Sequence, residues 1–175
     1  LVTRILSSEA LVDSETLRTG RLKTEDWENI ASVISSLSGC NIYIDDTSAM
    51  TTTAMKSKLR RIPNLGLVVI DYIGLMETTS KSDNRAQQVG EISRSLKIMA
   101  KDFGIPILCC AQLNRGTESR TGDGKKPTLA DLRDSGSIEQ DADIVLFLYR
   151  DEYYKDISGS DAQGAEESAN TAEVI

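Results

Sequence analysis

The stretch LVVIDYIGLM, residues 67–76, places a carboxylate directly after a run of four apolar residues. A short apolar run of this kind predicts a buried strand of a parallel sheet. Asp71 stands where that strand ends, and an acid in this position has two ordinary explanations. It can be the first solvated residue of a loop, or it can hold Mg²⁺ beside the phosphates of a nucleotide. The rest of the chain is needed to decide between them.

Helical and strand patterns alternate on both sides of this stretch. Apolar positions with helical spacing predict helices over residues 2–12, 24–38, 51–62, 86–103 and 129–142. Short apolar runs predict strands over residues 41–45, 66–72, 105–112 and 143–150, with another beginning at 170. This alternation predicts an α/β fold, a three-layer domain with a mainly parallel sheet between helices.

Local signals indicate where two of the helices begin and end. Thr24 is the expected N-cap of the helix over 24–38, and Gly39 is expected to end it. Gly104 is expected to end the helix over 86–103. The expected apolar faces consist of Trp27, Ile30, Ala31, Ile34 and Leu37 in the first helix, and of Val89, Ile92, Leu96, Met99 and Phe103 in the second.

The composition of the 175 residues is that of a globular protein, with 39% hydrophobic and 27% charged residues. No apolar run approaches the roughly 20 residues that span a bilayer, and the charged and polar residues Arg4, Ser7, Ser8 and Glu9 interrupt the N-terminal segment. We therefore expect no signal peptide and a cytoplasmic protein without membrane contact. The chain has no histidine and no C-x-x-C pair, which argues against a Cys/His zinc site. Cys40, Cys109 and Cys110 are expected to be reduced core residues.

The net charge of −7 is unevenly distributed. Residues 151–175 hold seven acids and one base, whereas the remaining 150 residues hold 20 acids and 19 bases. The bulk charge therefore gives no sign of a nucleic-acid partner, although it leaves a local site open. We expect an acidic loop over 151–170 and mobile loops over 77–88 and 115–127.

Polar side chains follow several of the expected strands, and in a parallel sheet these ends lie along one edge. They are Asp45, Asp46, Asp71, Gln112, Asn114, Arg115, Arg150 and Asp151. For Asp45, Asp46 and Asp151 an ordinary solvated loop is the favoured interpretation. The solvated-loop interpretation is weaker for Gln112, because this residue directly ends an apolar run.

Two other phosphate-related patterns are incomplete. An acid pair after one strand and a single acid after a later one resemble a receiver domain, but Gln112 or Arg150 stands where a receiver has Lys. The segment GDGKKPT, residues 122–128, resembles a P-loop, but Ser119 replaces the first Gly and Lys126 replaces the Ser or Thr that reaches Mg²⁺. No other part of the chain matches the P-loop pattern.

Three longer segments carry a family resemblance over residues 1–175. They are LVVIDYIGLM (67–76), EISRSLKIMAKDFGIPILCCAQLNR (91–115) and LADLRDSGSIEQDADIVLFLYRDEYY (129–154). With them the chain resembles the DnaB-type replicative DNA helicases, which are ring-shaped hexameric motors with a RecA-like ATPase domain. The resemblance implies a RecA-like motor domain, ATP and Mg²⁺ as cofactors, and single-stranded DNA as a partner. It also implies a homo-hexamer in the full-length protein, with primase and a helicase loader as further partners.

The resemblance implies roles for five residues. Asp71 matches the Walker B acid, which holds the Mg²⁺ shell of ATP. Gln112 matches the polar sensor of the γ-phosphate. Arg133, Asp134 and Gly136 match the loop that contacts single-stranded DNA, where Arg133 pairs with a phosphate and Gly136 brings a backbone N–H close.

The chain departs from the family pattern in places. Asp134 stands where the family usually has Glu, and Gly74 where it usually has Gln. The family's P-loop and catalytic Glu come before the first residue of this chain, and its arginine finger comes after the last. The resemblance therefore implies a RecA-like domain that is incomplete at both ends and does not hydrolyse ATP by itself.

Two alternatives remain open at this point. One is a RecA-like ATPase of another type, against which the segment DLRDSGSIEQDAD, residues 131–143, argues. The other is a module that binds DNA or joins a helicase ring without hydrolysing ATP. An Asp71→Asn change would abolish unwinding by a helicase but leave such a module unaffected.

Overall fold

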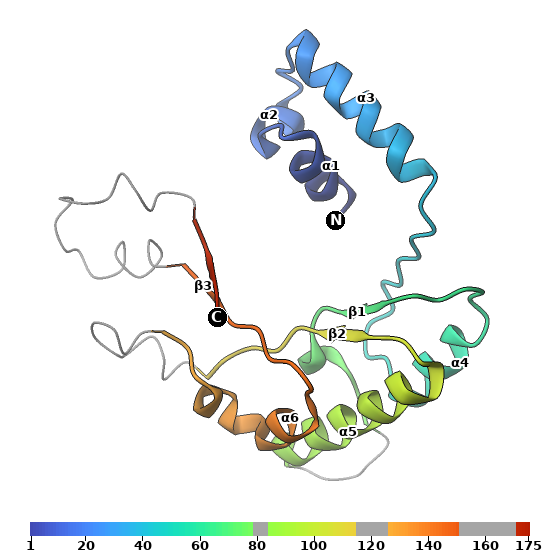
Figure 1. Cartoon of the computed structure of the whole chain (residues 1–175), viewed down its shortest axis with the longest axis vertical. Coiled ribbons are helices and arrows are strands. Elements are labelled where there is room, and N and C mark those ends of the chain that lie inside the picture. Colours follow the sequence, from blue (N-terminus) through green and yellow to red (C-terminus); the bar gives the residue numbers. More distant parts are fainter. Residues whose placement is uncertain (79–83, 115–125, 151–170) are drawn as a thin grey trace, which may run out of the picture. The chain divides into compact units, whose positions relative to one another are not determined.

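The computed structural model describes residues 1–78, 84–114, 126–150 and 171–175, and for residues 133–136 it describes the backbone alone. The described residues form two compact units, Leu1–Asp46 and Thr47–Ile175. Figure 1 shows the helices and strands of the two units, and each unit has its own apolar core. None of the helices in these residues is both long enough and apolar enough to cross a bilayer.

The first unit consists of three helices, α1 (Val2–Ala10), α2 (Ser14–Thr19) and α3 (Thr24–Ser38). Its buried core is small and is formed by Ala10, Val12 and Ile30. Asp13 caps α2, because its Oδ2 accepts a hydrogen bond of 2.9 Å from the backbone N–H of Thr16. The predicted helix over 24–38 is confirmed, and Gly39 follows its last residue.

Two details of α3 differ from the prediction. Thr24 is the first helical residue rather than the cap, and the Asp26 carboxylate accepts a hydrogen bond of 2.8 Å from the backbone N–H of Lys23. Of the predicted apolar face only Ile30 is buried, whereas Trp27 and Ile34 are exposed. The reason is that the described core of this unit meets α3 at Ile30 and the partly buried Val33, and Trp27 and Ile34 are not part of it.

The predicted strand over residues 41–45 is wrong. These residues form no strand, and Ile42, Tyr43 and Ile44 are exposed. An apolar run becomes a strand only when a neighbouring strand satisfies its backbone N–H and C=O groups. In the described part of the chain no strand pairs with this segment.

The second unit is built on a parallel pair of strands, β1 (Val68–Ile70) and β2 (Ile107–Cys109). Between them the chain forms the 3₁₀ turn η1 (Ile73–Leu75) and the long helix α5 (Arg85–Phe103). Helix α4 (Thr52–Leu59) precedes β1 and begins at the cap Thr51. The core joins one face of β1 and η1 to α5, through Val68, Ile70, Ile73, Met76, Val89, Ile92, Leu96 and Met99.

Helix α5 confirms the predicted apolar face, with Phe103 packed at the edge of the core. Asn84 caps its first turn, and Gly104 ends it with a left-handed φ of 64°. Because α5 begins at Arg85, the predicted loop over 77–88 is wrong for its last residues, and residues 79–83 lie outside the described part. In the described residues α5 covers one face of the sheet, and Val69 and Leu108 on the other face remain 57% and 51% exposed.

The C-terminal part of this unit contains the 3₁₀ helix η4 (Leu129–Ser135), helix α6 (Gly136–Asp141), and the antiparallel strands β3 (Leu148–Tyr149) and β4 (Glu173–Val174). The predicted helical piece over 129–142 and the predicted strand near the end are confirmed. The predicted strand over 143–150 is much shorter and mostly exposed. The predicted acidic loop over 151–170 and most of the loop over 115–127 lie outside the described residues.

Candidate functional site

Asp71 lies at the carboxyl end of β1, as predicted, and is exposed. The peptide bond between Asp71 and Tyr72 is cis. Two hydrogen bonds to Cys110, which follows β2, hold the backbone before and after Asp71. Cys110 donates its N–H to the carbonyl of Ile70 at 2.9 Å, and Ile73 donates its N–H to the carbonyl of Cys110 at 3.0 Å. The backbone around Asp71 is therefore fixed while its carboxylate is open to a ligand.

Gln112 follows β2 and is also exposed. The predicted strand over 105–112 is shorter than expected, because β2 ends at Cys109 and residues 110–114 form no strand. Since β1 and β2 are parallel neighbours, their carboxyl ends lie at the same edge, and Asp71 and Gln112 follow these two ends. The structure thus brings these two predicted residues to one edge of the sheet.

The donor set at this edge suits Mg²⁺ bound together with phosphates. In the described residues no three Cys, Asp or Glu side chains gather closely enough to hold a metal ion by themselves. Mg²⁺ commonly keeps several waters and takes only one or two carboxylates plus phosphate oxygens. The exposed carboxylate of Asp71 fits that requirement.

The cysteines agree with the prediction only in part. All three are free, as predicted, and Cys109 is partly buried against the core of the second unit. Cys40 and Cys110 are exposed, so the prediction of core residues is wrong for these two. Burial, with a smaller effect of Cys110, raises the pKa of the Cys109 thiol to about 11. Cys109 therefore stays protonated near neutral pH and is a poor nucleophile.

Arg133 lies on η4, as does Asp134, and Gly136 is the first residue of α6. Their side chains are outside what the structure describes. The residue that anchors this segment is Asp131, which sequence reasoning missed. Its carboxylate is buried and its Oδ2 accepts hydrogen bonds from the backbone N–H and the hydroxyl of Thr128, at 2.7 and 2.9 Å.

Asp131 also connects η4 to the segment that follows β2 and carries Gln112. Its backbone carbonyl accepts a hydrogen bond of 3.1 Å from the N–H of Asn114, two residues after Gln112. The sequence did carry a signal for this arrangement: a Thr followed three residues later by an acid is the pattern of a capping box. The start of η4 is thus tied to the edge that carries Asp71 and Gln112.

A hollow of about 590 Å³ lies elsewhere in the second unit. It is open to solvent and lies between the start of α4 and the first half of α5. Its lining is polar or mixed and consists of Thr51, Thr52, Thr53, Thr78, Gly90, Glu91, Ile92, Arg94 and Ser95. None of the predicted site residues lines this hollow, so it is separate from the candidate site.

Comparison with known proteins decides the family. The family model of the DnaB-like helicase C terminal domain matches residues 1–175. The chain belongs to this family. It is 45% identical over 175 residues to the replicative DNA helicase DnaB of Rickettsia bellii, and 46% identical over 158 residues to that of Geobacillus stearothermophilus. These alignments cover 97% and 88% of this chain but 35% and 34% of the relatives, so the chain spans about a third of their length.

Solved structures agree with this DnaB-like assignment. A DnaB-like replicative helicase, described with its interactions with primase, matches with a TM-score of 0.85 at 35% identity, covering 99% of this chain and 41% of that one. A second solved structure, an ATPase domain, matches with a TM-score of 0.84 at 35% identity, covering 99% of this chain and 60% of that one. The predicted RecA-like α/β fold is confirmed. The receiver-domain interpretation and the RecA-like ATPase of another type are excluded by the family.

Proposed function

We propose that the polypeptide carrying this chain is a replicative DNA helicase, which couples ATP hydrolysis to movement along single-stranded DNA and to the unwinding of the duplex. The observation that carries this proposal is the match of the whole chain to the DnaB-like family, since the matched relatives are named replicative DNA helicases. The shared edge of Asp71 and Gln112 supports it, because nucleotides bind at such edges of parallel sheets.

Asp71 and Gln112 form the nucleotide part of the proposed site. The Asp71 carboxylate holds the water shell of Mg²⁺, and the Gln112 amide detects the γ-phosphate from the neighbouring strand end. Bound Mg²⁺-ATP supplies the phosphoryl transfer that drives the motor. The rigid backbone on both sides of Asp71 serves this role, because a preorganised carboxylate does not have to reorient during the reaction.

Arg133, Asp134 and Gly136 form the DNA part. The Arg133 guanidinium pairs with a backbone phosphate, and the Gly136 N–H approaches the strand because no Cβ stands in its way. Asp134 orients Arg133 or contacts the strand through its amide. One such segment makes few phosphate contacts, so we propose a homo-hexameric ring that multiplies them around a single strand.

Primase and a helicase loader are the proposed protein partners. One structural neighbour was solved as a DnaB-like helicase together with its interactions with primase, which supports the first of these. The proposed site of action is the cytoplasm. None of these partners involves a membrane.

The test uses the full polypeptide that carries residues 1–175. We expect Asp71→Asn to abolish ATP hydrolysis and unwinding while leaving single-stranded DNA binding intact, because this change removes the charge that holds Mg²⁺. Asp46→Asn, which alters an exposed acid in another segment, serves as the matched control and is expected to change neither activity.

The readouts are phosphate release, strand displacement and fluorescence anisotropy with a labelled oligo(dT) strand. If unwinding persists in the Asp71→Asn protein, the assignment of the magnesium acid is wrong. If the unaltered polypeptide binds DNA but neither hydrolyses ATP nor unwinds a duplex, the non-hydrolysing module becomes the correct interpretation.

A further inference from the structure

The segment η4–α6, which carries the proposed DNA-contacting residues, packs closely against α5. At Gly90 the two helices approach so closely that a Cβ added there would lie 2.5 Å from Ser137 Oγ and 3.1 Å from Ser137 Cβ. One residue further on, Ile138 packs against the core cluster that α5 shares with β1. The same helix therefore supports both the strand that precedes Asp71 and the segment that carries Arg133.

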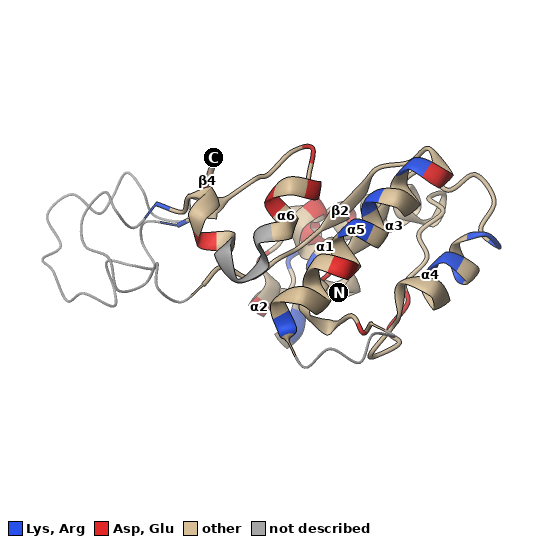
Figure 2. Cartoon of the chain, turned by 90° about the horizontal axis from the view of Figure 1, so that it is seen from below, with Lys and Arg blue, Asp and Glu red and all other residues tan. Residues whose placement is uncertain are grey.

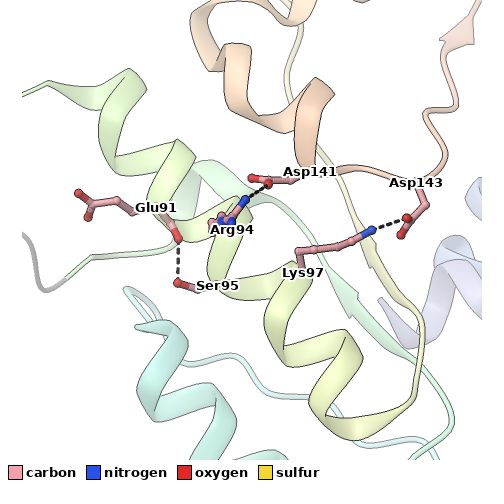
Figure 3. Close-up of polar contacts among 6 residues, drawn as sticks. All are labelled: Glu91, Arg94, Ser95, Lys97, Asp141 and Asp143. Carbon is pink, nitrogen blue, oxygen red and sulfur yellow. Dashed lines mark hydrogen bonds and ion pairs between the residues drawn. The ribbon is translucent and has the colours of Figure 1, made fainter.

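Two ion pairs fix the far end of this segment to α5 (Figure 3). Arg94 Nη1 lies 3.7 Å from Asp141 Oδ1, and Lys97 pairs with Asp143. The two basic residues are one turn apart on α5, and the two acids are the last residue of α6 and the second residue beyond it. Basic segments along α5 and acidic segments on α6 are both visible in Figure 2.

In each ion pair one side chain is partly buried and the other is exposed. The Asp141 side chain is only 10% exposed, whereas that of Asp143 is 82% exposed. In the second pair Lys97 is the more buried partner, and the hydrogen bond and charge of Lys97 lower the pKa of Asp143. Each pair thus joins one partly buried group to one exposed group, which restricts the segment more than two fully exposed groups do.

The near end of the segment is fixed as well. Asp131 is bound to Thr128 through its carboxylate and to Asn114 through its carbonyl. Residues 133–136 therefore lie between two anchored ends, with Asp131 on one side and the pairs of Asp141 and Asp143 on the other. The position of these residues depends on both anchors.

We propose that Arg94 and Lys97 are positioning residues, which hold the end of the η4–α6 segment on α5 and so set where Arg133 and Gly136 meet the DNA. This inference rests on the proposed function, because it assumes that residues 133–136 contact the strand. It assigns α5 the role of a common frame for the nucleotide edge and the DNA-contacting segment.

Neutralising Asp141 and Asp143 has opposite expected effects on DNA affinity under this proposal and under charge repulsion alone. Asp141→Asn and Asp143→Asn each remove a negative charge near a proposed DNA site, and electrostatics alone predicts tighter DNA binding. The same holds if Arg94 or Lys97 contacts the phosphates directly, because each change frees a cation. If the acids instead anchor the segment, their neutralisation loosens it and DNA binding becomes weaker.

The experiment measures the affinity of the full polypeptide for a fluorescein-labelled oligo(dT) strand by anisotropy, at low and physiological salt. We expect the double variant Asp141→Asn/Asp143→Asn to bind roughly three- to tenfold more weakly, the range set by two partly exposed ion pairs. Asp102→Asn is the matched control, because it neutralises an acid of α5 that pairs with Lys56 of α4 rather than with a residue of the segment. It is expected to bind DNA as tightly as the unaltered polypeptide, or slightly more tightly.

A charge exchange tests the pairing itself. Lys97→Glu is expected to weaken DNA binding, and combining it with Asp143→Lys is expected to restore most of the lost affinity. If Lys97 instead contacted the DNA directly, Asp143→Lys would not restore the affinity, because the positive charge would then lie at position 143 and not at position 97. The affinity for Mg²⁺ and an ATP analogue is expected to stay the same in all these variants, which a general loss of structure would not allow.

The Arg133→Ala variant distinguishes failure of the positioning role from failure of the proposed DNA site. Arg133→Ala is measured alongside, and if it leaves DNA affinity unchanged, the proposed DNA site is wrong and this inference falls with it. If Arg133→Ala weakens binding but the neutralised double variant binds equally well or more tightly, the positioning role alone is wrong. Failure of the charge exchange to restore affinity also overturns it.

Discussion

Asp131 is a buried acid whose hydrogen bonds hold the start of η4. The residue is 5% exposed, and its carboxylate accepts two hydrogen bonds from Thr128. We expect Asp131→Ala to lower the free energy of unfolding by about 1–3 kcal/mol, because both Thr128 donors lose their charged acceptor. Urea unfolding followed by circular dichroism measures the change.

The control for Asp131 is Asp46→Ala, which removes an exposed carboxylate. Its effect on the free energy of unfolding is expected to stay within about 0.5 kcal/mol, as for most surface changes. Equal effects of the two substitutions would contradict the anchoring role of Asp131.

Asp13 makes the stability of α2 dependent on pH. The hydrogen bond from the Thr16 N–H lowers the pKa of the Asp13 carboxyl from its ordinary value of 3.8. A group with a lowered pKa in the folded state contributes stability above its unfolded pKa and loses it as the pH falls through the folded pKa. The contribution of Asp13 is therefore complete at neutral pH and disappears in acid.

The comparison of wild type with Asp13→Ala tests this dependence. Thermal unfolding is expected to show a lower midpoint for the variant at neutral pH, and the difference should shrink as the pH falls below about 4. Asp13→Asn keeps a neutral cap and is expected to show a smaller pH dependence than the wild type. A difference that grows on acidification would contradict the assignment.

At the scale of elements, α5 is the main packing unit of the second compact unit. Ile92 is 1% exposed and belongs to the buried cluster, whereas Ile98 on the same helix is 51% exposed. We expect Ile92→Ala to cost about 2–5 kcal/mol of unfolding free energy, through lost burial and the cavity left behind. Urea denaturation measures it.

Ile98→Ala is the matched control, because it makes the same chemical change on the exposed face of α5. It is expected to change the free energy of unfolding by no more than about 0.5 kcal/mol. Similar losses at both positions would mean that α5 is covered by structure on both of its faces.

At the scale of the whole molecule, residues 41–46 lead from one compact unit to the other without helix or strand. Tyr43 is exposed there, whereas Tyr149 is buried within β3. We expect limited digestion with chymotrypsin to cut after Tyr43 well before it cuts after Tyr149, because a protease needs an exposed and locally extended backbone. Mass spectrometry of early fragments identifies the cut, and earlier cleavage after Tyr149 would contradict this boundary.

Sequence reasoning was most successful where the signal is local. The helices over 24–38 and 86–103 were predicted to within a residue, because helical periodicity and the glycines that follow are properties of neighbouring residues. The shared edge of Asp71 and Gln112 was also predictable, since parallel strands place their ends together. Burial was harder to predict, as the exposed Trp27 shows, because it depends on what packs against the helix.

The sequence by itself determined helices α3 and α5, the apolar strand that leads to Asp71, and the segments that mark the DnaB-like family, whereas helix α2 was not predicted. Only the tertiary structure decided which apolar runs become strands, because a strand needs hydrogen bonds from a distant partner, and residues 41–45 have none in the described chain. It also decided that Asp141 and Asp143 meet Arg94 and Lys97. These pairs join residues far apart in the chain, and only the packing of α6 on α5 brings their charges together.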